Sequence, residues 1–358
     1  MMIIVRTPFR ISFFGGGTDY PAWYEKNGGA VLATTINKYC YLTCRYLPPF
    51  FEHRIRVVYS KMESCQTVDE IQHPAVREVL RYLKMDRGVE IHHDGDLPAR
   101  SGIGSSSSFT VGLLHAVYAL KGKLVDKATL ARESIHIERD VLRETVGSQD
   151  QILAAYGGLN HITFGPGDVT AVKPLTLSRT RAKELNSHLM LFYSGIKRTA
   201  SRIAETYVNG IDRKQAHLHR LMRFVDEGLG ILNEGDIRDF GRLLHEAWLV
   251  KRDLSPEVTN PDVDLLYAEA RSAGALGGKL LGAGGGGFIL FFAPPERHEA
   301  IKERLHRLIF VPFQFEHHGS QIIFHDPRED YSELDLIRRH NHIEPFRELD
   351  QAKVRGKR

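Results

Sequence analysis

Two acidic residues stand out because they could take part in phosphoryl transfer. Glu138 lies in HIERDVL, and Asp150 stands between a glycine and the apolar run ILAAY. A hydroxyl and one carboxylate can hold Mg²⁺ on two phosphates, and a second carboxylate can accept the proton of an attacking hydroxyl. A position on a solvated helix face would also explain Glu138. The pair therefore indicates this chemistry only together with a phosphate-binding segment.

The segment LPARSGIGSSSSFTVGLLHAVYAL supplies such a candidate, a glycine- and serine-rich loop that leads into an apolar helix. The glycines allow backbone amides to turn toward a ligand, and the free N–H groups at a helix start attract an anion. A loop that only caps its helix with serine has a similar composition. The predicted ATP-binding residues are Gly102, Ile103, Gly104, Ser105, Ser106 and Ser107.

A second glycine run, GGKLLGAGGGGFILFF, fits neither of two common nucleotide-binding motifs. Its lysine is followed by leucine, and no glycine stands at the earlier position that a Walker motif needs. The run contains G-x-G-x-x-G, but a strand follows it where a dinucleotide-binding fold has a helix. We expect close backbone packing beside the glycine- and serine-rich loop of residues 102–108, called the phosphate loop below, with Gly284, Gly285 and Gly286 near the phosphates.

Arg10 and Asp19 bracket the N-terminal segment SFFGGGTDY. An arginine on a strand rich in aromatic residues needs an anion or a carboxylate as partner if it is buried. Asp19 follows a glycine turn, where it could bind sugar hydroxyls or cap the next helix. The residues alone leave both roles of Asp19 open.

The pattern of apolar residues predicts an N-terminal half of mixed strands and helices and a second, richly helical half. Strand-like runs fill the first sixty residues, and amphipathic helices and the strand GGLNHITF follow. A last strand, QIIFHDP, comes after the second glycine run. The predicted divisions are an N-terminal domain over 1–180, a C-terminal domain over 181–327 and a charged tail over 328–358.

The composition is that of an ordinary soluble globular protein, with 42% hydrophobic and 26% charged residues. A net charge of +4 without a dense basic stripe argues against nucleic acid as a partner. No apolar run is long enough to span a membrane, and two arginines interrupt the N-terminal apolar stretch. Cys40, Cys44 and Cys65 fit free thiols of a cytoplasmic protein better than a zinc site. The oligomeric state stays open, a homodimer included.

Three segments together resemble the GHMP kinase superfamily, which includes galactokinases and homoserine, mevalonate and phosphomevalonate kinases. TPFRISFFGGGTDY is similar to the first family motif and GGKLLGAGGGGF to the third. Residues Pro98 to Ser107 are similar to the second, P-x3-G-L-G-S-S-A, with Ile103 for the leucine and Ser107 for the alanine. The segments occur in the family's order, and the resemblance covers roughly residues 3–326.

The resemblance implies an α+β fold with an N-terminal α/β domain of ribosomal-protein type, a ferredoxin-like C-terminal domain and an active site between them. It also implies residue roles. Ser106 and Glu138 match the magnesium ligands, Asp150 the catalytic base of galactokinases, and Arg10 the basic residue that orients it. Asp19 matches the aspartate that binds acceptor hydroxyls.

Departures from the galactokinase pattern refine the expected acceptor. Gly16 and Gly17 stand where galactokinases carry Glu-His, which implies a wider pocket without a charge that would repel a phosphorylated sugar. GGGTDY and SGIKRTAS resemble segments of the bacterial heptose 7-phosphate kinases within this superfamily. Lys197 and Arg198 are expected either to clamp the 7-phosphate or to form a solvated basic turn. The expected acceptor site consists of Gly16, Gly17, Asp19, Tyr20, Lys197 and Arg198.

The resemblance thus implies a cytoplasmic sugar kinase that uses ATP and Mg²⁺. The expected acceptor is the anomeric hydroxyl of D-glycero-D-manno-heptose 7-phosphate, in the biosynthesis of nucleotide-activated heptose for surface polysaccharide. One alternative is a kinase for fucose, galactose or an unphosphorylated heptose. Another is a non-catalytic sensor of sugar and ATP, against which the retention of Ser106, Glu138 and Asp150 argues. A serine hydrolase would need a G-x-S-x-G elbow, which the serine run lacks.

Overall fold

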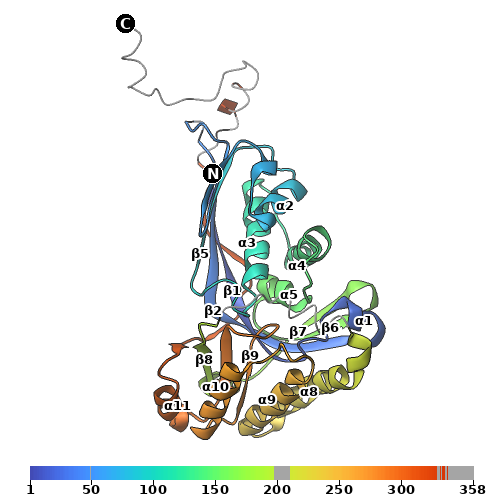
Figure 1. Ribbon diagram of the computed structural model, residues 1–358. Helices are drawn as coiled ribbons and strands as arrows, with labels where there is room; N and C mark the ends of the chain where they lie inside the picture. Colours follow the sequence, from blue (N-terminus) through green and yellow to red (C-terminus); the bar gives the residue numbers. More distant parts are fainter. Residues whose placement is uncertain (49, 197–209, 329–330, 332, 335–336, 338–358) are drawn as a thin grey trace.

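Two sheets, each covered by helices, organise the molecule (Figure 1). The structure is a computed structural model that describes residues 1–48, 50–196, 210–328, 331, 333–334 and 337. The predicted α+β fold class is confirmed. None of the helices in these ranges combines the length and apolar character that a membrane crossing requires.

The larger sheet is built around two long antiparallel strands, β1 (Met2–Phe14) and β2 (Gly29–Tyr46). Their alternating β-branched and aromatic residues favour extended backbone. Pro8 lies within β1 where the register with β2 shifts, because proline has no N–H to give to the ladder. The other strands of this sheet are β3 (Ile55–Val58), β4 (Met62–Cys65), β5 (Val89–Gly95), β6 (Leu159–Gly165), β7 (Val169–Pro174), β12 (Phe315–Glu316) and β13 (Gln321–Asp326).

Helix α3 (Ser105–Leu120) packs against β1 and β2 and is buried over most of its surface. Its apolar residues surround the helix axis, which is typical of a helix in the centre of a core. A π-helical turn, Ile137–Val141, follows α4 and leads toward α5. The other helices of this half are α1 (Pro21–Asn27), α2 (Pro74–Tyr82), α4 (Lys127–His136), α5 (Gln149–Tyr156) and α6 (Arg179–Ser187).

The smaller sheet has the strand order β11-β8-β10-β9, and its neighbouring strands are antiparallel. In chain order this is fourth, first, third, second, which is the arrangement of the expected ferredoxin-like domain. Helices α8 and α9 pack together, and α8 also contacts β1 and β2. The elements are β8 (Leu189–Tyr193), β9 (Gly277–Leu280), β10 (Phe288–Phe292), β11 (Ile309–Val311), α8 (Gln215–Glu234), α9 (Ile237–Arg252), α10 (Pro261–Ser272) and α11 (His298–Arg304).

The end of the chain departs from the predicted domain division. Strand β13 pairs with the free edge of β1, and β12 pairs with β2, so residues 315–326 belong to the first sheet. The prediction placed them in a C-terminal domain over 181–327. An alternating pattern identifies a strand but does not name its partner, and here the partner lies more than 300 residues earlier in the chain.

Candidate active site

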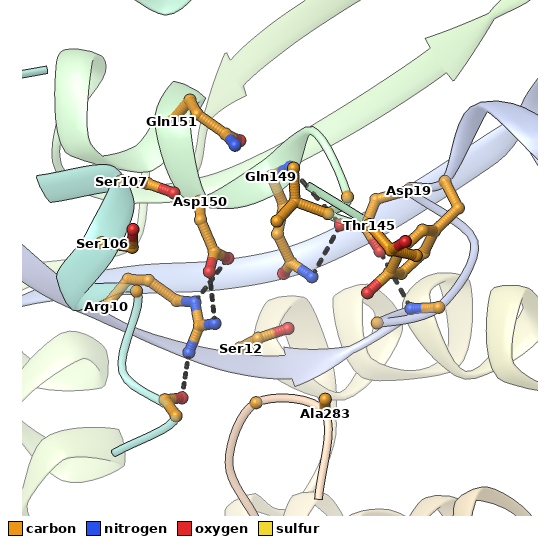
Figure 2. Close-up of a pocket in the computed structure, with 18 of the residues that line it drawn as sticks. Arg10, Ser12, Asp19, Ser106, Ser107, Thr145, Gln149, Asp150, Gln151 and Ala283 are labelled. Carbon is orange, nitrogen blue, oxygen red and sulfur yellow. Dashed lines mark hydrogen bonds and ion pairs between the residues drawn. The ribbon is translucent and has the colours of Figure 1, made fainter. Parts of the chain in front are cut away.

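A cavity of about 370 Å³ is lined by residues of both halves of the chain (Figure 2). The larger-sheet half contributes β1, the phosphate loop and the start of α5. The smaller-sheet half contributes α9, β9 and the second glycine run. The cavity therefore lies at the predicted junction of the two domains, and its volume is typical of a small-molecule site.

The phosphate loop adopts the backbone that its glycines predict. Gly102 and Gly104 have φ angles of +85° and +73°, and Gly104 is the N-cap of α3. Ser105 and Ser106 in the first turn line the cavity, where the free N–H groups of the helix can meet an anion. Ile103 is buried in the core, and its carbonyl accepts the Arg10 backbone N–H at 3.1 Å. Ile103 thus anchors the loop to β1.

Arg10 and Asp150 form a two-pronged ion pair at the centre of the site. Arg10 Nε donates to one carboxylate oxygen and Nη2 to the other, each at 2.7 Å. Arg10 Nη1 donates to the Gly102 carbonyl at 2.6 Å, which ties this pair to the phosphate loop. Arg10 is only 5% exposed, so its partner is the carboxylate that a buried guanidinium requires. Each Asp150 oxygen keeps a lone pair that could accept a further proton.

Glu138 is fully buried on the π-helical turn, behind the serines of the phosphate loop. Its Oε2 accepts from Ser107 Oγ at 2.8 Å and from Gln151 Nε2. Burial raises the pKa of Glu138 to about 7. The hydroxyl beside Glu138 is thus that of Ser107, whereas the predicted partner Ser106 is exposed and lines the cavity.

The second oxygen of Glu138, Oε1, has no hydrogen-bond partner among the described residues. An unpaired oxygen on a buried carboxylate is costly, and buried charges in proteins are paired or bind metals. A carboxylate and hydroxyls are also the hard oxygen ligands that Mg²⁺ prefers. The residues present therefore fit a divalent cation.

Asp19 is 1% exposed and is held by neutral donors. It accepts the Gly17 N–H at 2.9 Å and Gln149 Nε2 at 3.0 Å. Burial raises the pKa of Asp19, and the nearby charge of Asp150 acts in the same direction. Figure 2 shows Asp19 on the far side of Asp150 from the phosphate-loop serines.

The predicted acceptor residues Gly16, Gly17 and Tyr20 also line the cavity, beside Asp19. A Cβ built on Gly16 would make ordinary contacts, with Ser12 Oγ at 3.5 Å and Gln149 Nε2 at 3.7 Å, so a small side chain would fit there without a clash. Lys197 and Arg198 lie outside the described residues.

Gly147 sets the position of Asp19 by contact. A Cβ at residue 147 would lie 1.9 Å from Asp19 Oδ2. We expect Gly147→Ala to displace this carboxylate and to lower kcat/KM for the sugar by ~10²-fold, because small displacements in an active site have effects of this size. The Kd for ATP should change little. Steady-state kinetics with both substrates and a titration with ATP measure these effects.

Gly230→Ala is the matched control, since no atom of a described residue lies within 4 Å of a Cβ at this position in α8. It should leave kcat/KM unchanged and should not lower the thermal stability. A Gly147→Ala enzyme with normal sugar kinetics would show that Asp19 need not occupy the observed position.

The second glycine run packs directly on the phosphate loop. A Cβ on Gly282 would lie 2.6 Å from Gly102 Cα, so both positions require close backbone approach. The expected packing of the run beside the loop is therefore observed. The residues of the run that line the cavity are Gly282 and Ala283. The three predicted glycines lie further along: Gly284 and Gly285 contact Val258, and Gly286 contacts Ile196.

Two lysines of the cavity lining were not among the predicted site residues. Lys251 follows Leu244, Ala247 and Trp248 at helical spacing on the buried face of α9. Lys279 lies in β9, whose residues are all buried. The sequence did contain a signal for both lysines, because a charged residue within an otherwise apolar helix face or strand is unusual and indicates a functional role. Arg100, Glu144 and Gln149 also line the cavity, and only the tertiary structure brings them there.

Two family models match the chain. The model for the GHMP kinases N terminal domain covers residues 70–158, and that for GHMP kinases C terminal covers residues 229–309. Together with the fold and the site, these matches show that the chain belongs to the GHMP kinases. The protein is therefore a phosphotransferase with an alcohol group as acceptor, of the sugar kinase type.

Among individual relatives, the chain is 28% identical to the D-glycero-alpha-D-manno-heptose 7-phosphate kinase of Campylobacter jejuni over 84% of this chain and 92% of that protein. It is 26% identical to a galactokinase of Roseiflexus over 80% of this chain and 82% of that protein. A D-glycero-D-manno-heptose 1-phosphate kinase from Bacteroides thetaiotaomicron has a similar structure, with a TM-score of 0.74 and 25% identity over 91% of this chain and all of that chain.

Proposed function

We propose that this protein transfers the γ-phosphoryl group of ATP to the anomeric hydroxyl of D-glycero-D-manno-heptose 7-phosphate. The observation that carries the proposal is the Arg10–Asp150 pair, which lies between the phosphate loop and the acceptor residues around Asp19 (Figure 2). The lack of side chains at Gly16 and Gly17 in the cavity lining and the name of the Campylobacter jejuni relative favour a phosphorylated sugar. The product is suited to the biosynthesis of a nucleotide-activated heptose.

In the proposed reaction the acceptor hydroxyl oxygen forms a bond to the γ-phosphorus of ATP. The bond from this phosphorus to the β,γ-bridging oxygen breaks, and its electron pair leaves with ADP. The hydroxyl proton passes to Asp150, which acts as general base while Arg10 holds the carboxylate in place. Positioning of the two substrates would supply much of the rate enhancement.

The acceptor hydroxyls have suitable partners on the opposite side of the cavity. Asp19 can accept hydrogen bonds from sugar hydroxyls. Ser12 Oγ and Gln149 Oε1 are buried without a partner among the described residues, and both side chains line the cavity. Buried polar atoms of this kind are expected to be satisfied by a ligand or water.

Mg²⁺ would be held by Glu138 together with a hydroxyl of Ser106 or Ser107. When bound, it would neutralise charge on the β- and γ-phosphates of ATP. Ser107 already contacts Glu138, and Ser106 faces the cavity one residue earlier. Both serines are therefore candidates, Ser106 from the resemblance and Ser107 from the contact.

A panel of acceptors tests the proposal. D-glycero-D-manno-heptose 7-phosphate, the unphosphorylated heptose, galactose and fucose are compared by coupled ADP formation, with phosphorus NMR to locate the new phosphate. We expect kcat/KM for the 7-phosphate to exceed the others by ~10²-fold or more. Higher turnover of fucose or of the unphosphorylated heptose would contradict the proposed acceptor. Tight ATP binding with no turnover of any sugar would favour the sensor alternative.

A further inference from the structure

Two buried lysine side chains line the cavity without a partner of opposite charge among the described residues. Lys251 on α9 donates to the Gly282 carbonyl, and Lys279 on β9 donates to the Phe13 carbonyl at 2.9 Å. The two side chains belong to residues that are only 8% and 6% exposed. Neither lysine forms an ion pair with any residue that the structure describes.

The acidic groups nearby do not neutralise these lysines. Asp150 is occupied by Arg10, which forms two hydrogen bonds to it. Asp19 is bonded by neutral donors, and burial raises its pKa. Burial also lowers the pKa of Lys251 to about 8 and that of Lys279 well below the usual range. A buried cation without a counter-charge is costly, so this arrangement is suited to an anion that arrives with the substrates.

The position of Lys251 indicates which anion it meets. Its ammonium is bonded to Gly282, and Gly282 packs on Gly102 of the phosphate loop. Arg10, Asp19 and Asp150 are close enough for their charges to act on the pKa of Lys251. Lys251 therefore stands where the phosphate loop and the proposed base approach each other, which is where the γ-phosphoryl group must pass.

We propose that Lys251 is a further catalytic residue, whose ammonium donates hydrogen bonds to the γ-phosphoryl oxygens during transfer. Lys279 lies nearby in the cavity lining, and an anion bound there would favour the protonated form of both lysines. While the bond to the acceptor oxygen forms and the bond to the bridging oxygen breaks, negative charge spreads over the γ-phosphoryl oxygens. A fixed cation in a water-poor site stabilises this charge more than a solvated one would. The inference rests on the proposed transfer with Asp150 as base, and not on the identity of the sugar.

Two other roles of Lys251 make different predictions. If Lys251 only fixes the glycine run through Gly282, its loss should lower stability and ATP affinity together. If it binds a phosphate carried by the acceptor, its loss should raise KM for phosphorylated sugars and leave kcat nearly unchanged. A role in transfer should instead lower kcat for every acceptor.

The first test compares Lys251→Met and Lys251→Arg with the wild-type enzyme, using the best acceptor of the panel. For Lys251→Met we expect kcat to fall by ~10²–10³-fold. The KM for the sugar and the Kd for ATP should stay within about threefold, because the interaction strengthens in the transition state. Lys251→Arg should recover part of the rate. Lys302→Met is the control, since Lys302 pairs with Glu299 on the surface, and it should retain full activity.

A chemical rescue separates the missing amine from a folding defect. Lys251→Cys should be as slow as Lys251→Met, and alkylation with 2-bromoethylamine should restore a primary amine and at least tenfold in kcat. The native cysteines Cys40, Cys44 and Cys65 are all free and buried, whereas residue 251 lines the cavity. Wild-type enzyme treated in the same way should keep its rate. A folded Lys251→Cys enzyme with no rescue would overturn the proposal.

The reaction with water provides a readout that needs no sugar. Slow ATP hydrolysis without acceptor should also fall in Lys251→Met, because the same γ-phosphoryl charge develops. If the heptose 7-phosphate is not the acceptor but hydrolysis depends on Lys251, the proposed substrate fails and the role of Lys251 stands. An unchanged kcat with a raised KM only for phosphorylated sugars would instead assign Lys251 to the acceptor phosphate.

Discussion

Asp150→Asn is expected to lower kcat by ~10²–10⁴-fold while the Kd for ATP stays nearly unchanged. The amide keeps the shape of the side chain but cannot accept the hydroxyl proton. ATP binding should persist because the residues expected to bind ATP lie in the phosphate loop and at the start of α3. Asp150 lies on a different helix, α5. Single-turnover kinetics and a titration with ATP measure the two quantities separately.

The same substitution should also destabilise the protein. Arg10 would lose its charged partner while it stays almost fully buried. A broken buried pair costs about 3–5 kcal/mol, and the loss here should be smaller because the Asp150 side chain is 24% exposed. Activity must therefore be measured well below the melting temperature of the variant. Asp239→Asn is the control, because Asp239 forms an exposed pair with Arg242 that should contribute little. Near-normal kcat in a folded Asp150→Asn enzyme would disprove the proposed base.

A pH profile offers an independent check on the cationic group near the γ-phosphate. The charges of Arg10, Asp19, Asp150 and Lys279 interact with Lys251, and burial lowers the pKa of Lys251 to about 8. The protonated form is the active one, so kcat/KM should fall as the pH rises through about 8 in the free enzyme. Lys251→Arg should move this decline to higher pH, because guanidinium stays charged. Steady-state rates between pH 6 and 10 give the profile.

Sequence patterns identified those site residues whose backbone conformation depends on their neighbours in the chain. Gly102 and Gly104 predict a loop with positive φ angles before an apolar helix, and the structure contains this loop. The resemblance supplied Arg10 and Asp150 as a pair although 140 residues separate them, and they are in contact. Their spacing alone contained no information about this contact.

Other parts of the site depend on tertiary packing that no local pattern encodes. Lys251 and Lys279 line the cavity because α9 packs against β9 and β1, and because the Lys279 side chain of β9 donates to the Phe13 carbonyl of β1. The contact of Glu138 with Ser107 instead of Ser106 depends on how the π-helical turn aims the carboxylate. Strand β13 could be predicted as a strand, but its pairing with β1 is decided by which sheet edge remains free.

Glu138→Gln is expected to abolish most of the activity and yet to stabilise the protein when no metal is bound. As a magnesium ligand, Glu138 supplies a negative charge that glutamine lacks, so kcat/KM should fall by ~10²-fold and the Mg²⁺ concentration for half-maximal rate should rise. Ser107 and Gln151 can both hydrogen-bond to a neutral amide in place of the carboxylate.

The gain in stability follows from the pKa. Burial raises the pKa of Glu138 from 4.5 to about 7 in the folded protein. Folded Glu138 keeps its proton between these values while the unfolded chain has lost it, so stability falls as the pH rises from about 4.5 to about 7. The full cost at pH 8 is on the order of 3 kcal/mol.

Glutamine removes this cost, because it carries no charge to bury. Without metal, the melting temperature of Glu138→Gln should therefore exceed that of the wild type at pH 8 and match it near pH 5. Mg²⁺ with nucleotide should stabilise the wild type more than the variant, since the cation pairs with the buried charge. If Glu138 only supports the fold, the variant should be less stable at both pH values. If Glu138 lowers the stability of the metal-free protein and raises that of the Mg²⁺-bound protein, its role is to bind the cation.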